Sequence, residues 1–128
     1  MYKQKLCLAI GTSKTLGEEE QMLLYKKVGF DGFFTGYGND EQIVNIAAAA
    51  KREGMIFQSI HAPFHHVDKL WLEGEEGDSA LKEIADCIES AAKAGVEIVV
   101  SHVWIGFDRP EKPNALGLDR YAKLVRLA

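Results

Sequence analysis

Residues 57–66, the stretch that decides the fold, read Phe-Gln-Ser-Ile-His-Ala-Pro-Phe-His-His. An apolar strand is expected to end here, and the stretch carries three of the chain's four histidines. The fourth, His102, follows the apolar residues 98–100 and Ser101. Ligands of parallel α/β folds bind beyond the carboxyl ends of the strands, where loops and helix N-termini converge. The histidines therefore mark the expected position of a functional site.

The rest of the chain alternates apolar strands with helices. Strands are expected at about residues 6–10, 30–35, 55–61 and 96–103. A helix follows each of them, and the fourth helix is expected over residues 118–128. Three strands are preceded by a basic helix end and a glycine, in Lys-Val-Gly, Arg-Glu-Gly and Lys-Ala-Gly. Glycine suits a left-handed helix cap, and a cation suits the negative helix end. This repeat predicts a parallel sheet with right-handed helical crossovers, either open or part of a (β/α) barrel.

Local signals place helix ends and strand faces. Thr15 and Glu18 are spaced as a capping box for the first helix, and Asn39 with Gln42 is expected to cap the second. The second helix should bury a stripe formed by Ile43, Ile46, Ala47 and Ala50. Strand side chains repeat every two residues, so a single face is expected to hold Phe57, Ser59 and His61.

The composition of the chain limits its expected domain number, partners and location. The 128 residues, 47% of them hydrophobic, predict one domain over residues 1–128. A net charge of −4 argues against binding nucleic acid or anionic lipid. Cys7 and Cys87 lie in apolar segments and predict buried thiols in a reducing compartment. No run of about 18 apolar residues occurs, so neither a membrane span nor export is indicated, and a cytoplasmic location is expected.

His61 and His102 end neighbouring strands, and their imidazoles could meet in one site. A histidine at such a position can ligate a metal, transfer a proton or donate a hydrogen bond to a sugar hydroxyl. The alternative is a histidine satisfied by a nearby backbone carbonyl. His65 and His66 are expected in a surface loop, and Asp68 and Asp108 as solvated loop carboxylates.

Aromatic residues flank these histidines. Their rings could stack on the apolar face of a sugar, or they could anchor loops over the top of the fold: Phe64, Trp71, Trp104 and Phe107. Phosphate-binding glycine loops and the Gly-x-Ser-x-Gly elbow are missing from the sequence. Two histidines are also too few for a catalytic zinc site, which commonly uses three protein ligands. Weak or absent binding of manganese and zinc is therefore expected.

Four motifs together resemble the first half of a xylose isomerase-like TIM barrel, the superfamily of sugar phosphate isomerases and epimerases and of abasic-site endonucleases. They are residues 28–33 (Val-Gly-Phe-Asp-Gly-Phe), 60–64 (Ile-His-Ala-Pro-Phe), 70–78 (Leu-Trp-Leu-Glu-Gly-Glu-Glu-Gly-Asp) and 99–103 (Val-Val-Ser-His-Val). The resemblance implies a barrel of about eight βα units, of which this sequence supplies four.

The resemblance also implies where the chemistry lies. In the sugar-converting branch, a divalent metal (manganese, magnesium or zinc) is held by acidic residues and a histidine of the second half, which also carries the proton-transfer carboxylates. In the endonuclease branch, residues corresponding to His61 and His102 are zinc ligands. This sequence departs from the patterns at Phe34, where a glutamate is usual, and at Val103-Trp104, where Pro-Gly often follows the histidine.

The sequence therefore predicts an α/β protein, a parallel (βα)4 half of a TIM barrel resembling the N-terminal half of a sugar isomerase or epimerase. His61 and His102 are expected to orient or polarise a sugar or sugar phosphate. Alternatives are a non-catalytic binding or assembly module and an abasic-site endonuclease-like zinc protein. Four strands leave two open edges, so a homodimer or a C-terminal half is expected to cover them.

Overall fold

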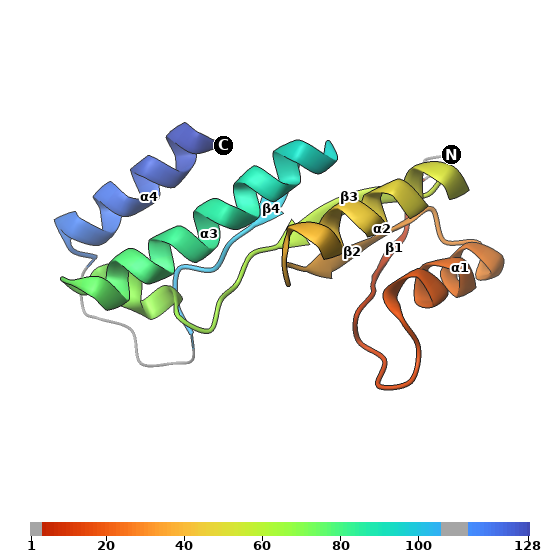
Figure 1. Cartoon of the computed structure of the whole chain (residues 1–128), viewed down its shortest axis with the longest axis horizontal. Coiled ribbons are helices and arrows are strands. Elements are labelled where there is room, and N and C mark those ends of the chain that lie inside the picture. Colours follow the sequence, from red (N-terminus) through yellow and green to blue (C-terminus); the bar gives the residue numbers. More distant parts are fainter. Residues whose placement is uncertain (1–3, 106–112) are drawn as a thin grey trace.

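The computed structural model describes residues 4–105 and 113–128. The chain alternates strands and helices, and Figure 1 labels them in chain order. The elements are β1 (Cys7–Ala9), α1 (Glu18–Val28), β2 (Gly32–Gly36), α2 (Asp40–Glu53), β3 (Ile56–His61), the 3₁₀ helix η1 (Val67–Trp71), α3 (Glu75–Ala94), β4 (Val99–Val100) and α4 (Ala115–Leu127). No helix in these described ranges is long and apolar enough to cross a membrane.

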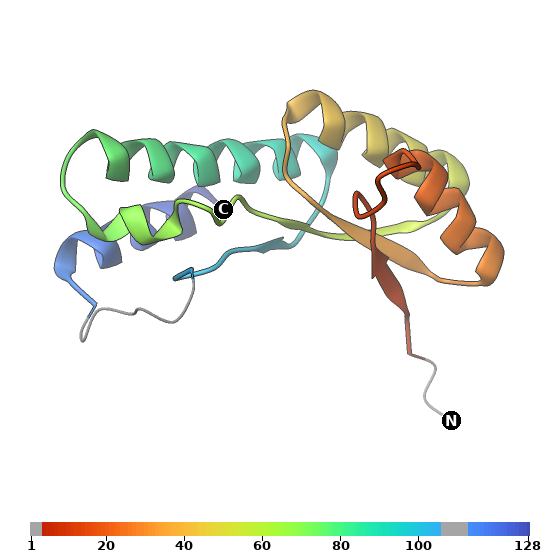
Figure 2. The same cartoon turned by 90° about the horizontal axis from the view of Figure 1, so that it is seen from below.

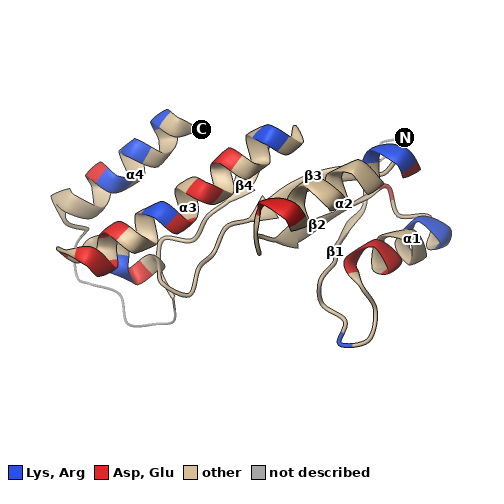
Figure 3. Cartoon of the chain, viewed as in Figure 1, with Lys and Arg blue, Asp and Glu red and all other residues tan. Residues whose placement is uncertain are grey.

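The strands form one parallel sheet in the order β1-β2-β3-β4. Helices α1, α2 and α3 lie along one side of it (Figure 2). Charged residues gather on the helices, whereas the strands carry almost none (Figure 3). Consecutive parallel strands joined through helices are the arrangement of a (βα)4 half-barrel, and the predicted fold class is confirmed.

Two apolar clusters fill the space between sheet and helices. The first lies under α1 and α2 and consists of Ile10, Met22, Phe33, Ile46, Ala49, Ala50 and Met55. The second joins β3, η1, α3 and α4, with Ile60, Leu70, Ile84, Cys87 and Leu124 among its members. Phe57 packs against both clusters, and its ring stacks on Phe33 with centroids 4.8 Å apart. The helix-covered side of the sheet is therefore the core.

A β-bulge in β3 changes which of its side chains lie on the same face of the sheet. Phe33 pairs with Phe57, but Phe34 pairs with Ser59, so β3 holds one extra residue, Gln58, at this point. A bulge breaks the two-residue alternation of side chains. Phe57 therefore faces the helices, as the buried Ile60 does, and the prediction that Phe57 shares a face with His61 is wrong.

The helix ends agree with the sequence in two cases and differ in one. The Asn39 Oδ1 accepts the predicted hydrogen bond from the Gln42 backbone N–H at 2.8 Å. The first helix is instead capped at Gly17, whose N–H donates to Glu20 Oε2 at 2.8 Å, so the predicted Thr15 cap is wrong. The basic helix ends before β2, β3 and β4 do close on left-handed glycines, with φ of 106°, 67° and 70°.

The fourth strand and fourth helix also differ from expectation. A strand over residues 96–103 was expected, but β4 spans only Val99–Val100. It has one neighbour, β3, so only one side of its backbone is held in a ladder. Helix α4 begins three residues earlier than expected because Asn114 caps it, accepting a hydrogen bond from the Gly117 N–H at 2.8 Å.

Candidate functional site

His61 and His102 meet at the carboxyl ends of β3 and β4. His61 pairs with Val100 in the sheet register, and His102 follows two residues later on the same face. Their Nε2 atoms lie 2.9 Å apart, and their ring centroids 4.8 Å. The expected convergence of the two imidazoles is present in the structure. We call these two side chains the histidine pair.

The hydrogen bonds of the pair define its neutral tautomers. His61 Nδ1 lies 3.1 Å from the backbone oxygen of Ala62, which can only accept, so Nδ1 carries the proton. The Nε2 of His61 is then an acceptor in the neutral pair, and His102 Nε2–H donates to it. The carbonyl contact considered as the alternative role for His61 is thus also present. It fixes the ring and leaves Nε2 directed at its partner.

Phe64 is the aromatic residue that contacts the pair. Its ring centroid lies 5.2 Å from that of His61, edge to face, and 5.3 Å from that of His102. The ring is 36% exposed, so it forms an apolar surface beside two polar nitrogens. This combination of an exposed ring and hydrogen-bonding groups is typical of carbohydrate sites, and the predicted sugar contact of Phe64 stays a prediction.

The neighbouring loop histidines lie outside the pair. The His65 ring contacts the Phe64 ring in a tilted arrangement, with centroids 4.5 Å apart and an interplanar angle of 32°. His66 is exposed, and its Nδ1 lies 3.2 Å from Glu83 on α3. Both are in the surface loop, as expected. Asp68 lies in the first turn of η1 and is partly buried, whereas Phe107 and Asp108 lie outside the described residues.

Trp71 and Trp104 pack on each other. Their rings are stacked 4.9 Å apart with an interplanar angle of 14°. Trp71 is only 7% exposed, and its Nε1–H donates to the Val103 oxygen at 3.2 Å. Gly117 of α4 comes so close to this indole that a Cβ there would lie 2.1 Å from a ring carbon. These contacts favour the role of loop anchors for the two tryptophans, and sugar binding by them stays a prediction.

Helix α4 supports the pair through Tyr121, a residue that the sequence did not single out. The Tyr121 hydroxyl donates to the backbone oxygen of His102 at 2.8 Å. Burial raises the pKa of Tyr121 to about 12, so the phenol remains a donor over the whole neutral range. No sequence signal marks this contact, because it joins two residues 19 positions apart across a long loop.

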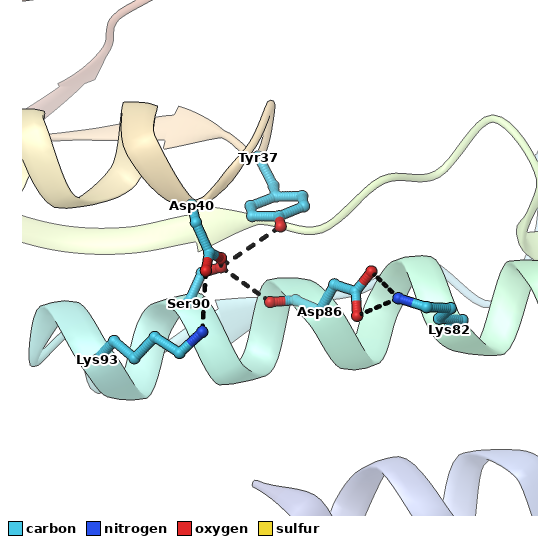
Figure 4. A network of polar contacts seen from close by, with 6 residues as sticks. All are labelled: Tyr37, Asp40, Lys82, Asp86, Ser90 and Lys93. Carbon is cyan, nitrogen blue, oxygen red and sulfur yellow. Dashed lines mark hydrogen bonds and ion pairs between the residues drawn. The ribbon is translucent and has the colours of Figure 1, made fainter.

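A polar network holds the other side of His61. The backbone N–H of Tyr37 donates to the His61 oxygen at 3.0 Å. Figure 4 shows the side chains of this network, in which Ser90 donates to Asp40 and Lys93 contacts the same carboxylate at 2.8 Å. The hydrogen bonds from Lys93 and Ser90 hold the pKa of Asp40 below its usual value. The network therefore ties the start of α2 to α3 beside the site.

A carboxylate also lies beside β2. Glu18 of α1 accepts hydrogen bonds from Thr35 Oγ1 at 2.6 Å and from Gln42 Nε2 at 2.8 Å. Thr35 pairs with Ile60 in the register and so lies on the helix-covered side of the sheet. Glu18 thus joins β2 to α1 and α2. It does not replace the glutamate that the family pattern places at Phe34.

The described residues do not form a complete metal site. Two imidazole nitrogens at about 2.0–2.1 Å from a tetrahedral zinc ion would be about 3.3 Å apart, which is wider than the 2.9 Å of the pair. The described part of the chain also contains no group of three or more His, Cys, Asp or Glu side chains able to hold an ion. The pair alone could supply two ligands and no more.

A mainly apolar cavity lies beside β4 and reaches the residues next to His102. It is a groove of about 540 Å³ on the helix side of β4, between α3 and α4. Its wall is mainly apolar and includes Ile84, Ile88, Val99, Leu124 and Val125. The wall also includes Ser101 and Tyr121, so the groove reaches the residues next to His102.

No protein-family model and no curated protein matches this chain. Among solved structures, it is similar to a crystal structure of D-psicose 3-epimerase in the presence of D-fructose, with 17% identity, 94% of this chain and 45% of that chain covered, and a TM-score of 0.58. It is also similar to a xylose isomerase domain protein from Planctomyces limnophilus, with 13% identity, 96% and 45% coverage, and a TM-score of 0.55.

The chain thus spans about 45% of the length of both structures. At such identities the likeness concerns the backbone and not the site residues. It shows that the chain has the fold of one half of a TIM barrel.

Proposed function

We propose that the chain binds a sugar or sugar phosphate as the N-terminal half of an isomerase- or epimerase-like barrel. The observation that carries this proposal is the histidine pair, with its two Nε2 atoms 2.9 Å apart at the carboxyl ends of adjacent strands. The fold of the two solved structures supports the sugar class, since one is an epimerase crystallised in the presence of D-fructose.

The tautomers give the pair a defined chemistry. In the neutral pair, His102 Nε2–H is a donor and His61 Nε2 is an acceptor, directed at each other. A sugar hydroxyl entering between them would accept from His102 and donate to His61. A sugar carbonyl would accept from His102 alone and become polarised. The Phe64 ring would cover the apolar C–H face of the same sugar.

Proton transfer at carbon needs a further group. Isomerisation and epimerisation require a base beside the substrate carbon. No described hydrogen bond or ion pair joins a carboxylate to His61 or His102. We propose that the base belongs to the part of a complete barrel that these four βα units do not supply. Turnover by this chain alone is then expected to be negligible, and the chain acts as a binding half.

The proposal is tested by recording imidazole NMR signals while D-fructose or D-psicose is added. We expect the signals of His61 and His102 to shift together, with a dissociation constant of about 1 mM or weaker. His61→Asn and His102→Asn should each weaken binding at least about tenfold, because each removes one partner of the bound oxygen. His66→Asn is the matched control, since this exposed loop histidine lies outside the pair.

Three results would contradict the proposal. Unchanged imidazole signals at saturating sugar would remove the binding role. Tight binding of one zinc or manganese ion per chain, lost in His61→Ala, would instead indicate a metal centre. Ketose interconversion by the purified chain, lost in His102→Ala, would show that the four units are catalytically complete.

A further inference from the structure

The backbone at His102 is held by side chains of η1 and α4. We propose that these two elements form a clamp that positions His102 in the candidate site, with Trp71 and Tyr121 as its contact residues. Both are positioning residues, because their hydrogen bonds go to the backbone and not to a ligand. The consequence for sugar binding rests on the proposed function, whereas the clamp itself can be tested without a sugar.

The hydrogen-bonded ladder of the sheet ends before His102. Strand β4 ends at Val100, and the Ala62 N–H donates to the Val100 oxygen at 2.9 Å. The next bond of a parallel ladder would run from the His102 N–H to the Ala62 oxygen. No such bond occurs among the described residues, and His61 Nδ1 lies 3.1 Å from that oxygen instead. The sheet therefore does not fix the position of His102.

Two side chains hold the segment that follows β4. The Tyr121 hydroxyl of α4 donates to the His102 oxygen at 2.8 Å. The Trp71 Nε1–H of η1 donates to the Val103 oxygen at 3.2 Å. These oxygens belong to successive residues, so the backbone at this point is fixed twice within a short distance. The position of His102 is thus set from the side of η1 and α4.

Helix α4 lies beside α3 (Figure 1) and is joined to η1 through three successive backbone oxygens. Arg120 donates to the Leu70 and Leu72 oxygens at 2.9 and 2.5 Å. Asn114 Nδ2, at the start of α4, donates to the Trp71 oxygen at 2.8 Å. The two donors of the clamp therefore belong to one packed unit, and both depend on the docking of α4 on η1.

His61 does not need the clamp. It ends β3, it pairs with Val100 in the register, and its oxygen accepts from the Tyr37 N–H at 3.0 Å. The sheet therefore holds His61, whereas the clamp holds His102. The 2.9 Å distance between their Nε2 atoms joins two differently supported segments. We infer that this distance is kept only while α4 is docked.

Sugar binding depends on the clamp through the position of His102. A sugar oxygen between the two Nε2 atoms needs about 2.8 Å to each of them, so atoms that are now 2.9 Å apart must separate. His102 is exposed, and rotation of its ring about a fixed backbone gives this room. Without the clamp, fewer chains hold His102 within reach of His61, and the apparent affinity falls by the same fraction.

The experiment compares Tyr121→Phe with Tyr25→Phe in protein whose histidines carry isotope-labelled nitrogen. Tyr25 is the matched control, because it is also partly buried, and its hydroxyl donates from α1 to the oxygen of Ala9, the last residue of β1, at 3.1 Å. The readout is the NMR scalar coupling across the hydrogen bond between the two Nε2 atoms. Tyr121→Phe should lower the ratio of paired to open chains about fivefold, and Tyr25→Phe should leave the coupling unchanged.

A second measurement follows the imidazole signals during addition of D-fructose. Tyr121→Phe should weaken binding about fivefold, whereas Tyr25→Phe should bind as the wild type does. If the wild type binds no sugar but only Tyr121→Phe loses the coupling, the proposed function fails and the clamp stands. If the sugar binds and both variants keep the coupling, the clamp fails and the proposed function stands.

The clamp would be overturned by any of three outcomes of the coupling measurement. These are a wild-type chain without the coupling, a Tyr121→Phe variant with the wild-type coupling, and an equal loss in Tyr25→Phe. If Tyr121→Phe does not fold, Arg120→Met replaces it, since this change loosens α4 from η1 and leaves Tyr121 in place. The coupling should then fall as well, and an unchanged coupling in a variant with a loosened α4 would overturn the clamp.

Discussion

The centre of the molecule and its two flanks are built from the same βα unit but differ in how much holds them. Strands β2 and β3 each have neighbours on both sides and are 5 and 6 residues long. The edge strands β1 and β4 have one neighbour each and are 3 and 2 residues long. Phe33 at the centre is fully buried, whereas Val28 and Val125 on the flanks are largely exposed. A strand is therefore longer and its residues are more buried when it has a neighbouring strand on both sides, and an apolar sequence alone does not ensure this.

The largest effect is expected at the centre. Phe33→Ala removes a fully buried ring that stacks on Phe57, and it should lower the free energy of unfolding by about 3–5 kcal/mol. Urea unfolding followed by circular dichroism measures this. Val44→Ala on the surface of α2 should change the same quantity by less than about 0.5 kcal/mol. Equal losses in the two variants would show that the centre is no better packed than the surface.

A smaller loss of stability is expected where Arg120 anchors α4 to η1 on the flank of the molecule. Arg120 is 4% exposed and donates to the backbone oxygens of Leu70 and Leu72 at 2.9 and 2.5 Å. Arg120→Met leaves these acceptors without their donor and should lower the free energy of unfolding by about 2 kcal/mol. Hydrogen exchange should show faster opening of α4 and η1 than of β2 and β3. Arg126→Met, near the exposed end of α4, is the control, and a uniform increase across the chain would contradict a separate flank.

The smallest effect concerns the contact that joins the two regions, Asp40 of α2 with Lys93 of α3. The hydrogen bond from Lys93 lowers the pKa of Asp40, so the contact stabilises the folded chain above the usual value of 3.8 and is lost as pH falls below it. Lys93→Met should therefore be slightly less stable than the wild type at pH 7, and the difference should shrink as the pH falls below 3.8 and Asp40 becomes protonated.

Thermal unfolding from pH 2 to 7 measures the Lys93→Met difference. Lys123→Met, on the exposed surface of α4, provides the control. A difference that persists at low pH would mean that packing of the lysine stem, and not its charge, joins α2 to α3.

The sequence by itself determined the βα order, the parallel sheet and the placement of His61 and His102 at strand ends. These are local properties, since apolar runs, a helix cap such as Asn39 and glycine helix ends act within a few residues. The periodicity failed at Phe57, because the bulge at Gln58 is set by the register with β2, a contact between distant segments. The capping-box spacing gave the wrong residue at Thr15, because two cap positions compete within three residues and Gly17 is the cap.

Tertiary structure decided what surrounds the histidines. The 2.9 Å contact of the pair, the cover of Phe64 and the hydrogen bond from Tyr121 each join different elements of the chain. Trp71 and Trp104 look alike in sequence as possible sugar contacts, but their stacking and the approach of Gly117 make them part of a packed anchor. The physical reason is that side-chain burial and direction depend on which elements pack together. This information lies in contacts between residues far apart in the sequence, such as His61 and His102, which are 41 positions apart.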